Sequence, residues 1–297
     1  MRLFTRVVEL GSFSAVAREE KMSQPTMSKA IAGLERDLGV RLFDRTTTSV
    51  IATEEGKRFY ARSKQVLEEY ADAIADVRGL TQRHAGALTV SAPVGLGELR
   101  LNALFLEFLA KYPEVEIELF LNDRMIDIVE EGVDVAVRLG DVLPPNVVAR
   151  HIASSPRVLV AAPAYLKGRP RIRRPEDLAK HEYLRYAGIA SGDRMEFSCA
   201  AEKIVVRTQG RYRLNNSAAL RQCFLDGIGL GTAPAWLVQD LIDTGALVRL
   251  LPKWTMASQS VHLVYPPRRY RSLRSQALLQ FLAEKIPRLP GFPGSVR

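Results

Sequence analysis

The chain has 297 residues, enough for about two domains, and its 47% hydrophobic and 25% charged residues are typical of a globular protein that buries a core. No apolar run approaches the roughly 18 residues that span a bilayer, and charged residues interrupt the N-terminal stretch, so we expect neither a signal peptide nor a membrane anchor. Cys199 and Cys223 form neither a metal-ligand spacing nor a disulfide framework, so a reducing, cytoplasmic location is expected.

The net charge of +9 indicates an anionic partner, but the charge is unevenly distributed. Residues 1–84 carry 14 Lys and Arg against 12 Asp and Glu, a net charge of +2. The remainder carries 28 against 21, a net charge of +7, with basic clusters at residues 167–174 and 268–274. Total charge therefore does not identify a nucleic-acid-binding segment, and the arrangement of side chains must do so.

Three short helices are predicted at the N-terminus. Ser12 is suited to cap the second helix, and Ser23 can cap the third, with Pro25 in its first turn, where a missing N–H costs nothing. The core face of the third helix is an apolar stripe at helical spacing, formed by Met27, Ile31, Leu34 and Leu38. The short connection before this helix is typical of a helix-turn-helix, which begins at about Phe13 and ends at about Ala32.

Outside the apolar stripe, the start of the third helix carries short polar, amide and cationic side chains. A helix that enters the major groove uses N-terminal amides and hydroxyls for base edges and phosphates, and a lysine for phosphate or guanine. Its N-terminus also favours phosphate through free N–H groups and the helix dipole. The candidate DNA-binding residues are Ser23, Gln24, Pro25, Thr26, Ser28 and Lys29. An ordinary surface helix capped by Ser23 and Gln24 is the alternative at this point.

A β-prone stretch at residues 40–53 predicts a hairpin, or wing, whose Arg45 can contact phosphate. Thr53 then caps a helix of roughly 25 residues with apolar side chains at alternating four- and three-residue steps. Because this helix stands between two independent domains, we expect it to pair with a second copy. The predicted dimerisation seam consists of Phe59, Val66, Tyr70, Ala73 and Val77, with Ser63 among them.

Strands and helices alternate after residue 85, which predicts an α/β domain with a parallel sheet. Strands are expected at residues 88–92, 116–121, 133–139 and 261–265, and near 157–162, 182–187, 203–207 and 211–214. Helices are expected around residues 125–132, 217–227 and 273–286. The run GIGLG at residues 227–231 is interpreted as a helix C-cap followed by a close-packed strand, because Thr232 replaces the third glycine of a dinucleotide-binding motif.

A ligand site is expected at the C-terminal ends of the strands, where ligands of open α/β sheets gather. The turn after the first strand offers Ser91 and the N–H groups of Val94 and Gly95 at a helix N-terminus, which is suited to a carboxylate. Arg138 ends another strand and can add a bidentate partner. Helix capping is the alternative for Ser91, and also for Ser217 at the start of the helix expected at 217–227; a surface or inter-lobe ion pair is the alternative for Arg138.

Motifs for catalysis or metal binding are absent from the sequence. The four histidines are dispersed without zinc spacing, and neither G-x-S-x-G nor a P-loop occurs. We therefore expect no catalytic residue, no metal site and no cofactor.

Residues 11–46 and 53–60 resemble the winged helix-turn-helix and linker helix of LysR-type transcriptional regulators. The motifs that carry the resemblance are Ser12–Phe13, Ser23–Gln24–Pro25–Thr26–Met27–Ser28–Lys29, Leu34–Glu35, Leu38–Gly39 and Leu42–Phe43–Asp44–Arg45. Family members begin several residues earlier, which a truncated chain or a late start codon would explain. Where the family often has a further basic residue in the wing, this chain has Thr47, Thr48 and Ser49.

The second half resembles the family's effector-binding domain, which is shaped like the type 2 periplasmic binding proteins. The resemblance implies a winged helix-turn-helix at residues 1–52, a linker or dimerisation helix at 53–84 and a two-lobed α/β effector domain at 85–297. Lobe 1 is expected at about 85–162 and 266–290, lobe 2 at about 163–265, with crossings near 161–164 and 264–267. By the same analogy, Asn216 and Ser217 face the cleft from the second lobe.

The resemblance implies a sequence-specific DNA-binding regulator of transcription, a homodimer or homotetramer and not an enzyme. Its partners would be double-stranded DNA and a small-molecule effector in the inter-lobe cleft, with an anionic group favoured there, and contact with RNA polymerase stays open. A solute-binding protein of a transport system is the alternative function. It fits residues 88–290 but leaves the helix-turn-helix unexplained.

Overall fold

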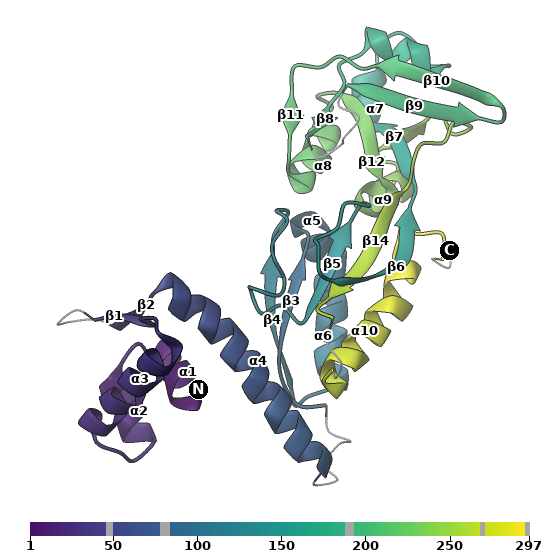
Figure 1. Ribbon diagram of the computed structural model, residues 1–297. Helices are drawn as coiled ribbons and strands as arrows, with labels where there is room; N and C mark the ends of the chain where they lie inside the picture. Colours follow the sequence, from purple (N-terminus) through teal and green to yellow (C-terminus); the bar gives the residue numbers. More distant parts are fainter. Residues whose placement is uncertain (46–49, 78–83, 188–192, 268–270, 295–297) are drawn as a thin grey trace.

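In the computed structural model, a winged helix-turn-helix, a long helix and a two-lobed α/β domain follow one another along the chain (Figure 1). The structure describes residues 1–45, 50–77, 84–187, 193–267 and 271–294. Thr47, Thr48 and Ser49, predicted to form the wing tip, lie outside these ranges. No described helix is long and apolar enough to cross a membrane.

The N-terminal domain is built from α1 (Arg2–Leu10), α2 (Phe13–Glu19) and α3 (Gln24–Leu38). Both predicted caps are confirmed: the Ser12 hydroxyl accepts the N–H of Ala15, and the Ser23 hydroxyl accepts the N–H of Thr26. The three helices bury one apolar core, whose members include Phe4, Val7, Phe13, Val16, Met27 and Ile31. Burial of Met27 and Ile31 fixes which face of α3 points outward.

The wing is a two-stranded antiparallel hairpin of β1 (Phe43–Arg45) and β2 (Val50–Ala52). The Glu35 carboxylate on α3 accepts the N–H groups of Leu42 and Phe43, at 2.9 and 3.2 Å, and so holds the start of the wing. The Thr53 hydroxyl then accepts the N–H of Gly56, at 2.9 Å, at the start of α4 (Glu54–Val77).

The central sheet of lobe 1 has the strand order β4-β3-β5-β14-β6. Its strands are β3 (Gly86–Ala92), β4 (Val115–Leu121), β5 (Val135–Leu139), β6 (Val148–Ser155) and β14 (Gln259–Tyr265). β3 runs parallel to β4 and β5, but β14 is antiparallel to β5 and β6. The prediction of a parallel sheet is therefore wrong for this half: the chain returns from lobe 2 at the end where β5 stops, so β14 must run back along it.

Two helices cover the sheet of lobe 1, α6 (Asn102–Lys111) and α10 (Leu273–Lys285), the latter extended by η3 (Ile286–Arg288). Between β3 and α6 the chain forms α5 (Val94–Leu96) and the π-helical turn η1 (Gly97–Leu101). The helix predicted around residues 125–132 is wrong. That segment forms one hydrogen-bonded turn, in which the Asp127 carboxylate accepts the N–H groups of Val129 and Glu130 while Ile128 is buried.

Lobe 2 is built on a three-stranded antiparallel sheet of the order β12-β7-β13. These strands are β7 (Arg157–Ala161), β12 (Leu230–Pro234) and β13 (Val248–Leu250). The other strands are β8 (Arg185–Tyr186), β9 (Arg194–Cys199), β10 (Glu202–Arg207) and β11 (Arg213–Leu214). The helices are α7 (Pro163–Leu166), η2 (Pro175–Lys180), α8 (Ser217–Leu225) and α9 (Ala235–Asp243).

This sheet membership corrects the predicted lobe boundaries. β7 already belongs to lobe 2, so the first crossing lies at Pro156, between β6 and β7, rather than near 161–164. β14 belongs to lobe 1, so the second crossing lies between β13 and β14, within residues 251–258, rather than near 264–267. The sequence pattern located β3, β4, β5, β7 and β14 but missed β6, β9 and β13, and it did not show which sheet each strand joins.

The interpretation of GIGLG is confirmed. Gly227 follows α8 with a φ of +66°, the left-handed conformation of a helix C-cap. A Cβ on Gly229 would lie 2.7 Å from the carbonyl oxygen of Glu182, and one on Gly231 2.8 Å from that of Leu184. The start of β12 therefore packs against backbone, which leaves no room for side chains.

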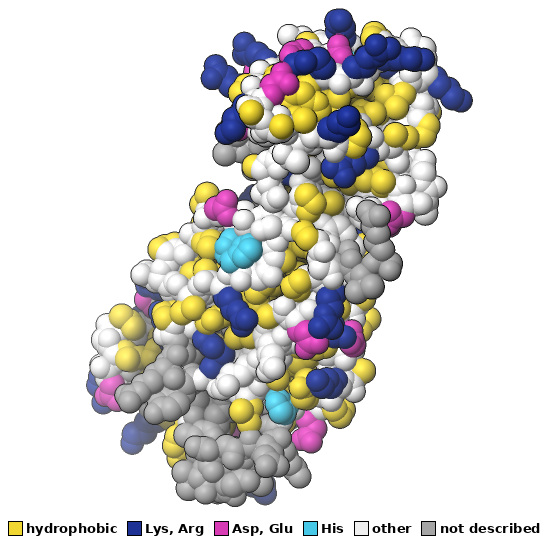
Figure 2. All heavy atoms as spheres, turned by 90° about the vertical axis from the view of Figure 1, so that its right-hand side faces the viewer, with side chains coloured by type: hydrophobic (Ala, Val, Ile, Leu, Met, Phe, Trp, Pro, Cys, Tyr) yellow, Lys and Arg dark blue, Asp and Glu magenta, His cyan; other side chains and the backbone are white. Residues whose placement is uncertain are grey.

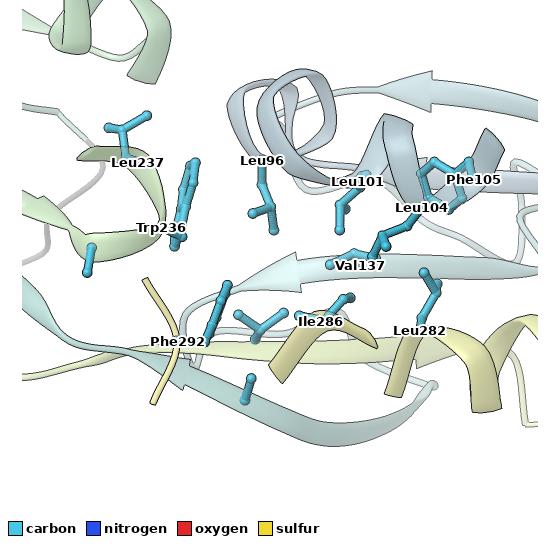
Figure 3. Close-up of a cluster of buried hydrophobic side chains, with 14 of the residues drawn as sticks. Leu96, Leu101, Leu104, Phe105, Val137, Trp236, Leu237, Leu282, Ile286 and Phe292 are labelled. Carbon is cyan, nitrogen blue, oxygen red and sulfur yellow. The ribbon is translucent and has the colours of Figure 1, made fainter. Parts of the chain in front are cut away.

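One apolar cluster continues from lobe 1 into the start of α9 (Figure 3). Trp236 and Leu237 at the start of α9 are buried and face Leu96 of lobe 1. The backbone N–H of Trp236 also donates to the Ser155 hydroxyl at the end of β6, at 3.1 Å. The lobes are thus joined by shared apolar packing as well as by the two crossing segments.

We predict that Gly56→Ala destabilises the winged domain, because a Cβ there would lie 2.1 Å from the carbonyl oxygen of Leu42. Overpacking against backbone costs about 1–3 kcal/mol. Gly33→Ala, in the interior of α3, meets nothing within 4 Å and serves as the control, expected to be neutral or to stabilise by up to about 1 kcal/mol. Hydrogen exchange of the α1–α3 amides measures both changes, and equal protection in the two variants would contradict the close approach.

Candidate nucleic-acid interface and ligand cleft

The first turns of α3 form an exposed surface. Gln24, Pro25, Thr26 and Lys29 are exposed, and Ser28 is half-buried. The Ser23 and Thr26 hydroxyls lie 2.8 Å apart, so both belong to the helix cap. The capping alternative is therefore confirmed for Ser23. The cap does not use the side chains of Gln24, Ser28 and Lys29.

Gln24 and Lys29 make no hydrogen bond or ion pair with the residues that the structure describes. An amide and an ammonium group, both free and both on the first turns of one helix, can donate to base edges and phosphates. Arg45 lies at the end of β1, but its side chain is outside the described part of the chain.

Most of the excess positive charge lies elsewhere. The cluster at residues 167–174 is on lobe 2, and Figure 2 shows Lys and Arg side chains gathered over that end of the molecule. Part of the cluster is satisfied within the lobe: Arg174 pairs with Glu202, and the Arg169 guanidinium lies 4.3 Å from the centre of the Tyr165 ring. Local arrangement, rather than net charge, thus distinguishes the α3 surface.

The predicted dimerisation seam divides into two halves on one face of α4. Phe59 packs against Phe4, with ring centres 5.2 Å apart, and Ser63 is fully buried. Val66 and Tyr70, further along, are 50% and 66% exposed. Phe59 therefore belongs to the core of the winged domain, which corrects its assignment to the seam. The side chains of Ala73 and Val77 lie outside the described residues.

A narrow cleft lies between the lobes, with a cavity volume of about 40 Å³. Gly95 of lobe 1 and Ser217 of lobe 2, both predicted to bind the ligand, are in contact at this cleft. The approach is so close that a Cβ added to Gly95 would lie only 1.8 Å from the Ser217 hydroxyl oxygen. The lining consists of Pro93, Gly95, Leu96, Asp123, Leu139, Arg157, Tyr186, Ser217, Leu220, Thr232, Pro234, Trp236, Leu237 and Gln259.

Two other predicted contacts are taken up within the chain. The N–H of Val94, expected to be free for a carboxylate, donates to the Asp123 carboxylate at 3.0 Å. The Asn216 side chain caps α8 by accepting the N–H of Ala219 at 2.9 Å. The chain's own side chains thus satisfy both positions.

Ser91 and Arg138 contact each other but do not line the described cleft. Arg138 is buried and donates to the Ser91 hydroxyl and to the carbonyl oxygen of Val137, both at 2.9 Å. Burial lowers the pKa of the Arg138 guanidinium, against the opposing charges of Glu131 and Asp123. No described carboxylate forms an ion pair with it, so the structure supports neither the effector-anchor role nor the ion-pair alternative.

The cleft also contains polar residues that the sequence pattern did not identify: Asp123, Arg157, Tyr186, Thr232 and Gln259. Two of them are oriented by neighbours, since the Trp236 indole donates to Gln259 at 2.9 Å and the Tyr183 hydroxyl donates to Thr232 at 2.8 Å. A sequence signal existed for Arg157, the single charged residue at the head of an apolar strand.

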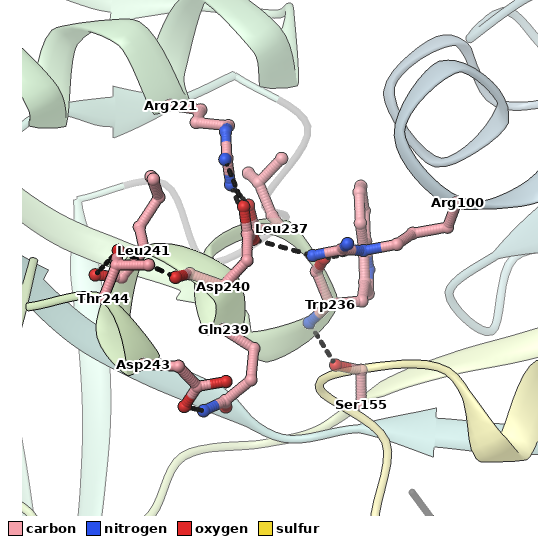
Figure 4. Close-up of polar contacts among 10 residues, drawn as sticks. All are labelled: Arg100, Ser155, Arg221, Trp236, Leu237, Gln239, Asp240, Leu241, Asp243 and Thr244. Atoms are coloured by element: carbon pink, nitrogen blue, oxygen red, sulfur yellow. Dashed lines mark hydrogen bonds and ion pairs between the residues drawn. The ribbon is translucent and has the colours of Figure 1, made fainter. Parts of the chain in front are cut away.

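A polar bridge lies beside the cleft and joins the lobes (Figure 4). Asp240 on α9 accepts from Arg100 of η1, in lobe 1, at 2.7 Å, and from Arg221 of α8, in lobe 2, at 2.9 Å. Burial alone would raise the pKa of Asp240, but the hydrogen bonds and charges of the two arginines outweigh it and lower the pKa.

Two family descriptions match the chain. "Bacterial regulatory helix-turn-helix protein, lysR family" matches residues 1–57, and "LysR substrate binding domain" matches residues 81–287. The regulator PtxR of Pseudomonas aeruginosa is 32% identical over 287 residues, covering 97% of this chain and 92% of that protein. The activator TtdR of Escherichia coli K12 is 28% identical over 285 residues, covering 95% and 91%.

Solved structures agree with these matches. The LysR-type regulator CrgA of Neisseria meningitidis superposes with a TM-score of 0.63 at 28% identity, covering 96% of this chain and 97% of that one. The full-length virulence activator AphB of Vibrio cholerae gives 0.61 at 25% identity, covering 95% and 97%. These proteins are named as transcriptional regulators or activators rather than transport proteins, which argues against the solute-binding alternative.

We predict that Asp240→Asn lowers the free energy of unfolding of the C-terminal domain by about 1–3 kcal/mol, because it leaves two partly buried guanidinium groups without their countercharge. Asp243→Asn on the same helix, where the partner is the Gln239 amide, is the control and should change little. Urea denaturation measures both.

The depressed pKa of Asp240 gives the same prediction a pH dependence. A carboxyl group with a lowered folded-state pKa contributes stability above its unfolded pKa of about 3.9 and loses it as pH falls through the folded value. The difference between the wild type and Asp240→Asn should therefore shrink below about pH 4. A difference that is the same at pH 3 and pH 7 would contradict the bridge.

Proposed function

Because the chain belongs to the LysR family of DNA-binding transcriptional regulators, we propose that its dimer binds an inverted repeat through the exposed face of α3 and responds to a small molecule in the inter-lobe cleft. The observation that carries the DNA-binding part is the pair of free, exposed groups of Gln24 and Lys29, positioned by the burial of Met27 and Ile31. The observation that carries the effector part is the cleft lined from both lobes.

In this proposal α3 enters the major groove by its N-terminal turns. Gln24 reads a base edge, Lys29 and the N-terminal N–H groups bind phosphate, and Arg45 extends the contact from the wing. The first 84 residues have a net charge of only +2, so one copy binds DNA weakly. Pairing of two copies on half-sites about 34 Å apart then supplies the affinity and the two-fold symmetry of the site.

Dimerisation is proposed to use the exposed half of the α4 seam, Val66 and Tyr70, extended by Ala73 and Val77. Dimers can associate further into a homotetramer. A cytoplasmic location follows from the proposed target, since the DNA is there, and binding beside a promoter would bring the protein within reach of RNA polymerase.

The effector acts by shifting an equilibrium between arrangements of the protein, and it can do so only by its difference in affinity for them. In the cleft it would lie beside the point where Gly95 and Ser217 bring the lobes into contact. A ligand there changes the relation between the lobes, and hence between the two halves of the dimer, with no catalytic step.

We predict different effects for the two free side chains of α3. Gln24→Ala should reduce discrimination between a site selected from random DNA and its scrambled version by about 10-fold, because a bidentate base contact is worth about 1–3 kcal/mol. Lys29→Ala should weaken binding to both sequences equally, and it should reduce the salt dependence of the binding constant by the equivalent of about one phosphate contact. Fluorescence anisotropy at several salt concentrations measures this, with Lys111→Ala on lobe 1 as the control. If Gln24→Ala instead weakened binding to both sequences equally, Gln24 would not read a base.

We predict that Val66→Glu with Tyr70→Glu raises the dimer dissociation constant more than 10-fold, since four charges in a closed seam repel and must be desolvated. Val142→Glu, at a 77% exposed position on lobe 1, is the matched control and should leave the dimer intact. Sedimentation velocity gives the distribution of species. An unchanged dimer in the double variant would show that α4 does not pair through this face.

A further inference from the structure

Arg157, the first residue of β7, is an unpaired cation in the cleft. Its guanidinium makes no hydrogen bond or ion pair with the part of the chain that the structure describes. Nearby arginines differ, because Arg100 and Arg221 share Asp240. Burial lowers the pKa of the Arg157 guanidinium. No Asp or Glu among the described residues offsets this effect, which agrees with the lack of a countercharge.

A half-buried charge without a partner lowers the stability of the folded chain. A perturbed ionisable group that lines a cleft and has a specific geometry there is a candidate for ligand binding. Arg157 sits at the crossing from lobe 1 to lobe 2, so a ligand bound to it would contact both lobes.

The groups around Arg157 limit what the ligand can be. Tyr186 lines the same cleft, and its hydroxyl makes no hydrogen bond with the described residues, so it can donate. Asp123, also in the lining, already accepts the N–H of Val94 and presents a negative charge that disfavours a second anionic group on the ligand. The apolar remainder of the lining is Pro93, Leu96, Leu139, Leu220, Pro234, Trp236 and Leu237.

We propose that the effector is a small monocarboxylate with an apolar body, whose carboxylate is bound by Arg157 in bidentate fashion and by the Tyr186 hydroxyl. Arg157 is thus the specificity-determining residue, in place of Arg138, which contacts Ser91 and does not line the cleft. This inference rests on the proposed function, in which the cleft is the effector site. It adds the chemical class of the ligand and the residue that selects it.

The test uses the full chain and matched pairs of compounds, phenylacetate with phenylacetamide and octanoate with octanamide. In thermal-shift and calorimetric titrations, at least one carboxylate should stabilise the wild type, whereas its neutral amide should not. Arg157→Gln should weaken carboxylate binding by about 10- to 100-fold, Arg157→Lys by less, and Tyr186→Phe by a few-fold. Arg171→Gln, at an exposed position of lobe 2, is the matched control and should bind like the wild type.

A structural role for Arg157 makes the opposite prediction for the protein without ligand. If the residue held the lobes together, Arg157→Gln would lower the melting temperature. If Arg157 instead binds a ligand and has no partner without one, Arg157→Gln removes an unpaired charge and should leave the melting temperature unchanged or raise it.

The inference and the proposed function fail in different ways. Binding of amides and carboxylates alike, undisturbed by Arg157→Gln, would overturn the ligand class and the anchor but leave the cleft as the effector site. The absence of carboxylate-selective stabilisation across the panel would also overturn the ligand class. A carboxylate that still binds when Ser217→Leu fills the cleft would show that the site lies elsewhere, which would overturn the effector part of the proposed function.

Discussion

The contact between α9 and lobe 1 is the interaction on which the effector domain depends. Trp236 and Leu237 belong to the same apolar cluster as Leu96, and Asp240 on the same helix binds arginines from both lobes. Because this contact is partly apolar and partly ionic, it joins the lobes while leaving the cleft beside it to polar groups. In the proposed function, a ligand in the cleft would therefore act on a junction that is already formed, and it would shift the balance of lobe arrangements without having to bring the lobes together.

The winged domain could be predicted from the sequence because its determinants are local. Caps at Ser12 and Ser23 act within three residues, and the spacing of Met27 and Ile31 fixes which face of α3 is exposed. The seam of α4 was predictable only as a stripe. Its first half is covered by α1, through Phe4 and Phe59, and no periodicity on α4 reveals where a neighbouring helix lies.

The ligand cleft was harder to predict because its walls come from distant segments. Arg138 and Arg157 both stand at strand ends, but which of them lines the cleft depends on how the sheets pack. The N–H of Val94 was expected to be free, but it donates to the carboxylate of Asp123, which lies 29 residues further along the chain. The lobe boundaries were misplaced for the same reason, since β14 joins the sheet of lobe 1 through pairing with β5.

We propose that the two weakly charged winged domains of one dimer bind DNA together. A footprint of the full-length protein on the DNA that flanks its own gene, at low salt, is the most direct measurement of such binding. Two protected half-sites related by a two-fold axis and about one helical turn apart are predicted. Absence of any protected site at low salt, where phosphate contacts are strongest, would contradict the account.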